Sequence, residues 1–129
     1  MPRIVLIVED SPLETPSLEI ALNALPGLRI EYAATGRAAL DFLRSANGGR
    51  VCAVLTDLNM PVMDGYELIR HVRADSFLSE LPVIVLSGDS DPETPRRTME
   101  AGANAYFPKP YSPIEVRKRL EQLLHAREP

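Results

Sequence analysis

The amino-acid sequence predicts an α/β fold in which a parallel sheet is covered by helices on both faces. Short apolar runs, often rich in β-branched residues, alternate with longer segments whose apolar residues recur at helical spacing. Five such strand–helix repeats imply an open sheet joined by right-handed crossovers. A length of 129 residues suits one domain, and we expect it to extend over residues 1–129 without a second domain.

The first two repeats occupy the N-terminal third of the chain. Ile4–Val8 is apolar on both faces and too short for a helix, which is typical of a buried parallel strand. Because Pro16 would delete a hydrogen bond in a helix capped by Ser11, we expect this helix to be irregular at its start or to begin near Thr15. Leu28–Tyr32 alternates apolar and polar residues, so we expect an edge strand. The helical faces of these repeats carry Leu18, Leu22 and Leu25, then Ala39, Leu40 and Leu43.

The middle of the chain holds a second buried strand at Val51–Thr56. Asp64-Gly-Tyr-Glu67 has the spacing of a capping box and should open the next helix. The apolar face of that helix carries Leu68, Ile69 and Val72.

The C-terminal part contains the last two repeats. Val83–Ser87 is another buried strand, and a helix over residues 92–101 should end at Gly102. Ala105–Phe107 is a weaker run, and Pro108 cannot donate to a strand ladder, so the last strand should be short and lie at an edge. The final helix carries Val116, Leu120, Leu123 and Leu124 on one face.

Composition excludes several classes of protein. The longest apolar runs have about half a dozen residues, whereas a membrane-spanning helix needs about 20. The net charge of −4, without a basic stripe, argues against a nucleic-acid partner. Cys52 is the only cysteine, so no disulfide can form within the chain, and we expect a reducing compartment such as the cytoplasm.

Polar side chains follow four of the five expected strands. They are Glu9 and Asp10 after the first strand, Asp57 after the third, Ser87 at the end of the fourth and Lys109 after the fifth. The carboxyl ends of parallel strands share one edge of the sheet, where ligands of open α/β folds bind. We therefore expect these side chains to meet there.

Three carboxylates in one place repel each other, and a divalent cation would relieve that repulsion. Oxygen ligands suit Mg²⁺, which usually keeps waters and shares its shell with a phosphate. With two histidines and one cysteine, a zinc site is disfavoured. A metal, a lysine and a hydroxyl together can stabilise a phosphoryl group, and an aspartate among them can act as the nucleophile.

Four motifs carry a resemblance to a known family: Val8-Glu9-Asp10-Ser11, Thr56-Asp57-Leu58-Asn59-Met60-Pro61-Val62-Met63-Asp64-Gly65, Leu86-Ser87-Gly88 and Tyr106-Phe107-Pro108-Lys109-Pro110. In order and spacing, over essentially the whole chain, the sequence resembles the receiver domain of two-component response regulators. The resemblance implies a flavodoxin-like (βα)5 fold with strand order 2-1-3-4-5. It also implies a stand-alone signalling domain without an output domain, and not an enzyme.

The resemblance assigns roles to the acidic residues. Asp57 would accept a phosphoryl group from a sensor histidine kinase or a histidine phosphotransfer protein. Asp10, Asp57 and the backbone carbonyl of Asn59 would bind Mg²⁺ or Mn²⁺, and Glu9 would act through a metal-bound water.

The resemblance also implies a switch. Lys109 would pair with one phosphoryl oxygen and Ser87 would donate to another, with a cis peptide bond between Lys109 and Pro110. Tyr106 would swing inward as Ser87 moves toward the phosphate, changing the face formed by helix 4, strand 5 and helix 5. A downstream protein would bind that face, and the receiver would be a monomer or a weak dimer.

Two other functions are weighed against this one. A phosphohydrolase of the haloacid-dehalogenase type also uses an aspartate, Mg²⁺, a hydroxyl and a lysine. It needs a second aspartate two residues after the nucleophile, however, where this chain has Asn59. A phosphate-independent, receiver-like adaptor would not need the full set of acidic residues, hydroxyl and lysine. Whether the chain passes phosphate onward or acts on an effector stays open.

Overall fold

The computed structural model describes residues 2–11 and 15–127, which form a five-stranded parallel sheet in the order β2-β1-β3-β4-β5. The fold and strand order expected from the sequence are confirmed. The strands are β1 (Arg3–Val8), β2 (Leu28–Ala33), β3 (Val51–Thr56), β4 (Val83–Ser87) and β5 (Ala105–Pro108). The helices are α1 (Pro16–Asn23), α2 (Gly36–Leu43), α3 (Gly65–Ala74), α4 (Thr94–Ala101) and α5 (Pro113–Ala126), with a short 3-10 helix, η2 (Gly48–Arg50), before β3.

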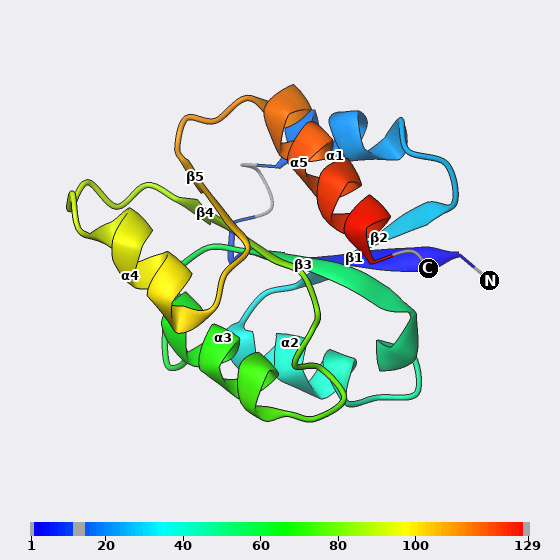
Figure 1. The fold of residues 1–129 in the computed structure, drawn as a ribbon, viewed down its shortest axis with the longest axis horizontal. Helices are drawn as coiled ribbons and strands as arrows, with labels where there is room; N and C mark the ends of the chain where they lie inside the picture. Colours follow the sequence, from blue (N-terminus) through cyan, green and yellow to red (C-terminus); the bar gives the residue numbers. More distant parts are fainter. Residues whose placement is uncertain (1, 12–14, 128–129) are drawn as a thin grey trace.

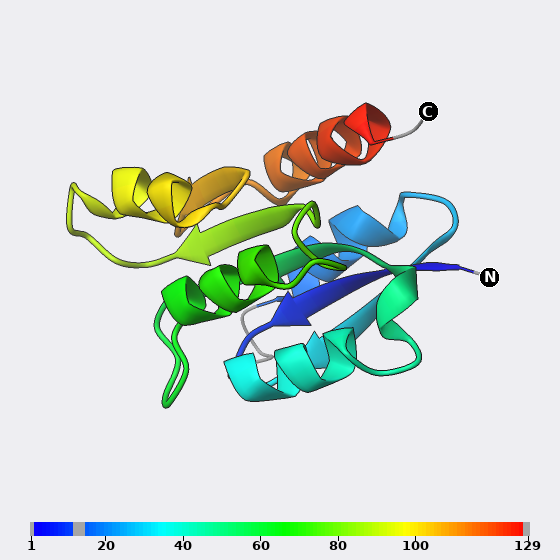
Figure 2. The ribbon, with the colours of Figure 1, turned by 60° about the horizontal axis from the view of Figure 1, so that its bottom comes forward.

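Helices cover both faces of the sheet (Figure 1, Figure 2). α1 and α5 lie side by side on one face, whereas α2, α3 and α4 lie on the other. Alternate residues of β1 enter different cores: Ile4, Leu6 and Val8 pack on the α2–α3 side, and Val5 and Ile7 pack on the α1–α5 side. Because both faces of the sheet are buried here, the five residues of β1 after the exposed Arg3 are all apolar, which explains the lack of alternation from Ile4 to Val8.

The two weaker strands lie at the edges of the sheet, as expected. β2 pairs only with β1, and β5 pairs only with β4 among the described residues. β5 spans four residues and ends at Pro108, which lies opposite Ser87 of β4. Because the strands are parallel, the carboxyl ends of β1, β3, β4 and β5 lie next to one another in this order at one end of the sheet. We call this end of the sheet the rim.

The ends of three helices test the expected boundaries. α1 begins at Pro16 after Thr15, which confirms a start near Thr15. Asp64 Oδ1 accepts a hydrogen bond from the Glu67 N–H at 2.9 Å and caps α3, as the capping-box spacing predicted. α4 ends at Gly102, which has a φ of 119°, as expected.

The expected start of α4 at residue 92 is wrong by two residues, since the helix begins at Thr94. The residues before it form turns instead. Asp91 Oδ1 accepts from the Glu93 N–H at 2.9 Å, and the Asp91 carbonyl accepts from the Thr94 N–H at 3.0 Å. These hydrogen bonds give the N–H groups of Glu93 and Thr94 their partners in a turn around Asp91. Residues 92 and 93 therefore form this turn and not the first turn of the helix.

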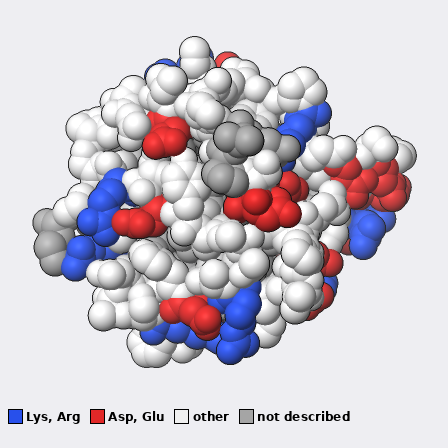
Figure 3. Space-filling model, turned by 180° about the vertical axis from the view of Figure 1, so that it is seen from behind, with Lys and Arg blue, Asp and Glu red and all other residues white. Residues whose placement is uncertain are grey.

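The surface seen from behind carries acidic and basic side chains in small neighbouring groups (Figure 3). Several ion pairs lie on single helices, such as Arg96 with Glu100 on α4, and Arg96 also pairs with Glu93 directly before that helix. Within the described part of the chain, no helix is both long and apolar enough to cross a membrane.

Candidate functional site

Three of the predicted side chains form one cluster at the rim. Glu9 follows β1, Asp57 follows β3 and Lys109 follows β5. The Lys109 ammonium Nζ donates to Asp57 Oδ2 at 2.9 Å and to Glu9 Oε2 at 3.3 Å. Although 52 residues separate Asp57 from Lys109 in the chain, parallel strand topology places both at the same edge. We call Glu9, Asp57 and Lys109 the rim cluster.

The carboxylate of Asp57 is held at both oxygens. Its Oδ1 accepts from the backbone N–H groups of Leu58 at 2.7 Å and Asn59 at 3.3 Å, while Oδ2 faces Lys109. The side chain is 12% exposed, so it is accessible to a small reactant. These contacts fix the direction of the carboxylate without covering it completely.

Gly65 allows the start of α3 to pack closely beneath Asp57. A Cβ atom at Gly65 would lie 2.5 Å from the carbonyl oxygen of Asp57 and 2.8 Å from Cα of Leu58. The Gly65 N–H donates to the Leu58 carbonyl at 2.9 Å. Only a residue without a side chain fits there, and the Asp-Gly pair at the start of the helix is its sequence signal.

Glu9 is the most buried carboxylate of the rim cluster, with 7% of its surface exposed. Its Oε1 accepts from the Ser11 N–H at 3.1 Å, and its Oε2 faces Lys109. Burial raises the pKa of Glu9, and the neighbouring Asp10 and Asp57 raise it too, while the Ser11 N–H and Lys109 lower it. An added cation would therefore favour the ionised form of this carboxyl.

The remaining predicted metal ligands lie beside the rim cluster. Asp10 is exposed and neighbours Glu9, and Asn59 is exposed after Asp57. No three His, Cys, Asp or Glu side chains among residues 2–11 and 15–127 are arranged as a ready-made metal centre. Mg²⁺ does not require one, because it binds through one or two carboxylates and keeps several waters. The acidic oxygens around Asp57 therefore fit Mg²⁺.

Ser87 reaches the rim from the end of β4 and is completely buried. Its Oγ accepts from the Asp89 N–H at 3.1 Å, which leaves the hydroxyl proton available for another acceptor. Its carbonyl accepts from the Lys109 N–H at 2.7 Å, so the two strand ends are fixed to each other. The peptide bond between Lys109 and Pro110 is cis, as expected.

Tyr106 lies outside the rim cluster. It is half-buried in β5 opposite Val85 of β4 and packs against the core on the α2–α3 side. The structure therefore places it two residues along β5 from Pro108, the partner of Ser87 in the ladder.

Sequence reasoning missed the conformation of the loop that follows Asp57. Val62 has a φ of 70°, in the left-handed region that β-branched residues rarely adopt. The Met63 N–H donates to the Pro61 carbonyl at 2.8 Å, which closes a three-residue γ-turn around Val62. Because valine disfavours this conformation, the amino-acid type at this position gives no signal for the turn.

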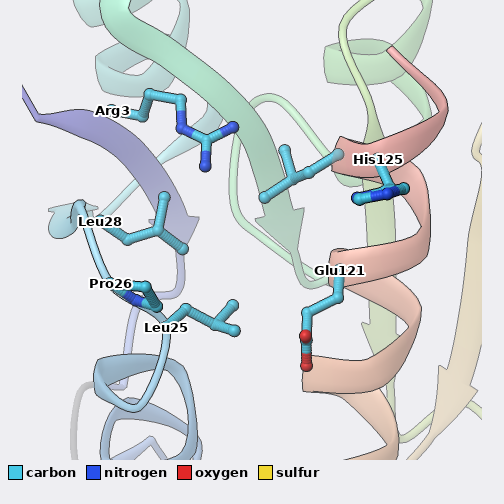
Figure 4. Close-up of a pocket in the computed structure, with 7 residues that line it drawn as sticks. Arg3, Leu25, Pro26, Leu28, Glu121 and His125 are labelled. Atoms are coloured by element: carbon cyan, nitrogen blue, oxygen red, sulfur yellow. The ribbon is translucent and has the colours of Figure 1, made fainter. Parts of the chain in front are cut away.

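A separate concavity of about 150 Å³ lies at the opposite ends of the strands (Figure 4). It is lined by Arg3, Leu25, Pro26, Leu28, Glu121, Leu124 and His125. Arg3 and Leu28 are the first residues of β1 and β2, so this concavity is at the amino-terminal ends. Ligands of open α/β sheets bind at the carboxyl ends, which favours the rim as the functional site.

Residues 5–121 match the family model described as the response regulator receiver domain. The chain belongs to this family. It is 36% identical over 126 residues to the transcriptional regulatory protein PrrA of Mycobacterium tuberculosis, an alignment that covers 98% of this chain and 51% of PrrA. The chain thus spans about half the length of several curated relatives that it matches.

Solved receiver domains share the fold. The signal receiver domain of a histidine kinase from Syntrophus aciditrophicus is 33% identical, with a TM-score of 0.85, covering 98% of this chain and 92% of that one. The receiver domain of a sensor histidine kinase from Pseudomonas aeruginosa is 29% identical, with a TM-score of 0.79, covering 97% and 99%. That structure has a magnesium ion coordinated in its active site cleft.

Proposed function

We propose that this receiver domain accepts a phosphoryl group on Asp57 from a phosphohistidine of a sensor histidine kinase or a histidine phosphotransfer protein. The observation that carries the proposal is the 2.9 Å contact between Lys109 Nζ and Asp57 Oδ2 at the carboxyl ends of the strands. This contact places a nucleophilic carboxylate beside the Lys109 ammonium, which can then bind the negatively charged phosphoryl group.

In the proposed reaction, a carboxylate oxygen of Asp57 forms a bond to phosphorus while the bond from phosphorus to the imidazole nitrogen breaks. The imidazole leaves with the electron pair of that bond and takes up a proton. Lys109 exchanges its contact with the Asp57 carboxylate for a phosphoryl oxygen, and its charge limits the build-up of negative charge. The Leu58 N–H, 2.7 Å from Asp57 Oδ1, keeps the carboxylate oriented throughout.

Asp10, Asp57 and the backbone carbonyl of Asn59 would hold Mg²⁺ or Mn²⁺, with Glu9 contributing through a bound water. When bound, the metal ion would stabilise the negative charge of the phosphoryl oxygens. The pKa of Glu9 is raised by burial, and Asp10 and Asp57 contribute to that rise. A cation bound at this position would offset the repulsion among these carboxylates, which supports the proposed metal site. The magnesium ion in the related Pseudomonas receiver domain supports the same assignment.

Phosphorylation would be transmitted through Ser87. Its hydroxyl proton can be donated to a phosphoryl oxygen, because Oγ accepts only the Asp89 N–H among the described groups. Movement of Ser87 would allow Tyr106 to turn inward and change the face formed by α4, β5 and α5, which a downstream protein would bind. The absence of a possible disulfide within the chain supports a reducing compartment such as the cytoplasm.

The test is the intact mass of the protein after incubation with acetyl phosphate, with and without Mg²⁺. We expect a gain of one phosphoryl group in the wild type only when Mg²⁺ is present, and none in Asp57→Asn. A phosphorylated Asp57→Asn protein would overturn the assignment of the acceptor.

If the wild type gains no mass, beryllofluoride distinguishes two explanations. A structural response to beryllofluoride and Mg²⁺ would support a phosphoryl group that is hydrolysed faster than the assay detects. No response would overturn the proposal in favour of a phosphate-independent adaptor.

A further inference from the structure

The residues of strand β5 specify its register only weakly. The strand spans four residues at the edge of the sheet, and within the described part of the chain it pairs with β4 alone (Figure 1). Ala105 is its one buried residue, and Pro108 has no N–H to donate to the ladder. Because register is set mainly by the pattern of buried side chains, a strand with one buried alanine needs other contacts to fix it.

Asn104, directly before β5, supplies such contacts. Its backbone N–H donates to the Val83 carbonyl at 2.8 Å, and its side-chain Oδ1 accepts from the Val83 N–H at 2.8 Å. One residue therefore binds both backbone groups of the first residue of β4. A slip of β5 by one residue would break both hydrogen bonds at once, so Asn104 favours a single register.

Arg73 of α3 holds the side chain of Asn104 in place. Its guanidinium donates from Nη2 to Asn104 Oδ1 at 2.9 Å, from Nη1 to the Leu81 carbonyl at 2.6 Å and from Nε to the Gly102 carbonyl at 2.9 Å. Leu81 precedes β4, and Gly102 precedes β5. The donors of a guanidinium have fixed directions in one plane, so Arg73 fixes the starts of the two strands relative to each other.

The other end of β5 leads to Lys109 at the rim. The Lys109 N–H donates to the Ser87 carbonyl at 2.7 Å, and its Nζ donates to Asp57 Oδ2 at 2.9 Å. Successive residues of a strand are about 3.3 Å apart, so a slip of one residue would move Lys109 by about that distance. Such a displacement would break the contact between Lys109 and Asp57.

We propose that Asn104, held by Arg73, is a positioning residue for phosphorylation, because it fixes the register of β5 and thereby the position of Lys109 beside Asp57. Asn104 lies at the end of β5 opposite the rim, so it acts through the strand. The effect on phosphorylation rests on the proposed function. The effect on register does not, because it follows from the hydrogen bonds to Val83.

NMR spectroscopy of the unmodified protein tests the register. In the wild type, we expect nuclear Overhauser effects that match the pairing of Tyr106 with Val85, and slow exchange of the Lys109 amide with deuterium. Asn104→Leu removes the acceptor of the Val83 N–H with little change in size. It should weaken or shift these Overhauser effects and accelerate exchange at Lys109 by roughly 5- to 100-fold. Wild-type Overhauser effects and exchange in Asn104→Leu would overturn the proposal.

Two further variants at this position sharpen the test. Asn104→Asp keeps an oxygen acceptor for Val83 and Arg73, so it should retain the wild-type register. If Asn104→Leu does not fold, Asn104→Ala removes the same acceptor without an apolar side chain and should show the changes expected of Asn104→Leu. A disturbed register in Asn104→Asp, or a wild-type register in Asn104→Ala, would contradict the assigned role of the side-chain oxygen.

The initial rate of phosphorylation by acetyl phosphate, followed by intact mass with Mg²⁺ present, tests the positioning of Lys109. We expect Asn104→Leu to react roughly 10- to 100-fold more slowly than the wild type, and Asn104→Asp to react at close to the wild-type rate. The affinity for Mg²⁺, measured by calorimetry, should not change, because the proposed metal ligands lie outside β5. A wild-type rate in Asn104→Leu, or a parallel loss of Mg²⁺ affinity, would overturn the positioning role.

A double variant decides whether Asn104 acts through Lys109. When Lys109 is already replaced in Lys109→Ala, Asn104→Leu should lower the remaining phosphorylation rate by less than about 2-fold, since residues that act through one contact are not additive. If the two substitutions instead lower the rate by the product of their separate effects, Asn104 acts independently of Lys109 and the proposal is wrong.

Asp75→Leu is the matched control. Asp75 Oδ1 accepts from the Phe77 N–H at 2.9 Å in the loop before β4, so the substitution removes a similar hydrogen bond outside β5. Its register and phosphorylation rate should equal those of the wild type. A loss of rate as large as that of Asn104→Leu would show that general destabilisation is sufficient and would overturn the proposal. A wild type that gains no phosphoryl group would contradict the proposed function, and the NMR comparison would still decide whether Asn104 fixes the register.

Discussion

Replacement of Val62 by glycine should stabilise this receiver domain, although it removes a whole side chain. The φ of Val62 is 70°, and the side chain is completely exposed. Its removal therefore exposes no apolar surface that folding had buried. What changes is the conformational energy of the backbone, because glycine adopts positive φ as readily as negative φ.

The expected magnitude follows from two opposing contributions. A non-glycine residue held in a sparsely populated backbone region costs about 1–3 kcal/mol. Glycine gives the unfolded chain more freedom, which destabilises the folded state by about 0.4–1 kcal/mol. The difference is a stabilisation of about 0.5–2 kcal/mol for Val62→Gly, or a rise in Tm of roughly 2–8 °C for a domain of this size.

Urea denaturation at equilibrium and calorimetry measure this effect. Phe77→Gly is a suitable control, because Phe77 is also in a loop and 97% exposed but does not have a positive φ. The control should lose about 0.4–1 kcal/mol of stability through the entropy of the unfolded chain. If Val62→Gly loses stability to the same extent, the γ-turn stores no strain and the reasoning is refuted.

Two further substitutions probe the rim. Gly65→Ala should destabilise the protein by about 1–3 kcal/mol in urea denaturation, because the new Cβ would lie 2.5 Å from the Asp57 carbonyl oxygen; wild-type stability would contradict this packing. Burial raises the pKa of Glu9, so ionisation of Glu9 opposes folding. Without Mg²⁺, the stability of the wild type relative to Glu9→Gln should therefore fall as the pH rises from about 4.3, the ordinary glutamate pKa, through the raised pKa of Glu9. A difference that does not vary with pH would show that Glu9 has its ordinary pKa.

Much of the rim was predictable because it depends on order along the chain. Apolar runs mark the strands, and parallel topology requires that the residues after them share one edge. That argument is sufficient to bring Lys109 to Asp57 and Glu9, and the structure confirms the meeting of these three residues. It does not specify which oxygen each donor contacts, because that depends on side-chain directions rather than on order.

By itself, the sequence determined the alternation of strands and helices, the edge positions of β2 and β5, and the end of the sheet where the acidic residues gather. These features follow from the periodicity of apolar residues and from the backbone chemistry of proline and glycine, both of which are local. Only the tertiary structure decided that α4 begins at Thr94, that Val62 has positive φ, and that the hydroxyl of Thr98 is buried without a described partner. Each of these depends on which groups approach from distant parts of the chain, and contacts of that kind leave no periodic trace in the sequence.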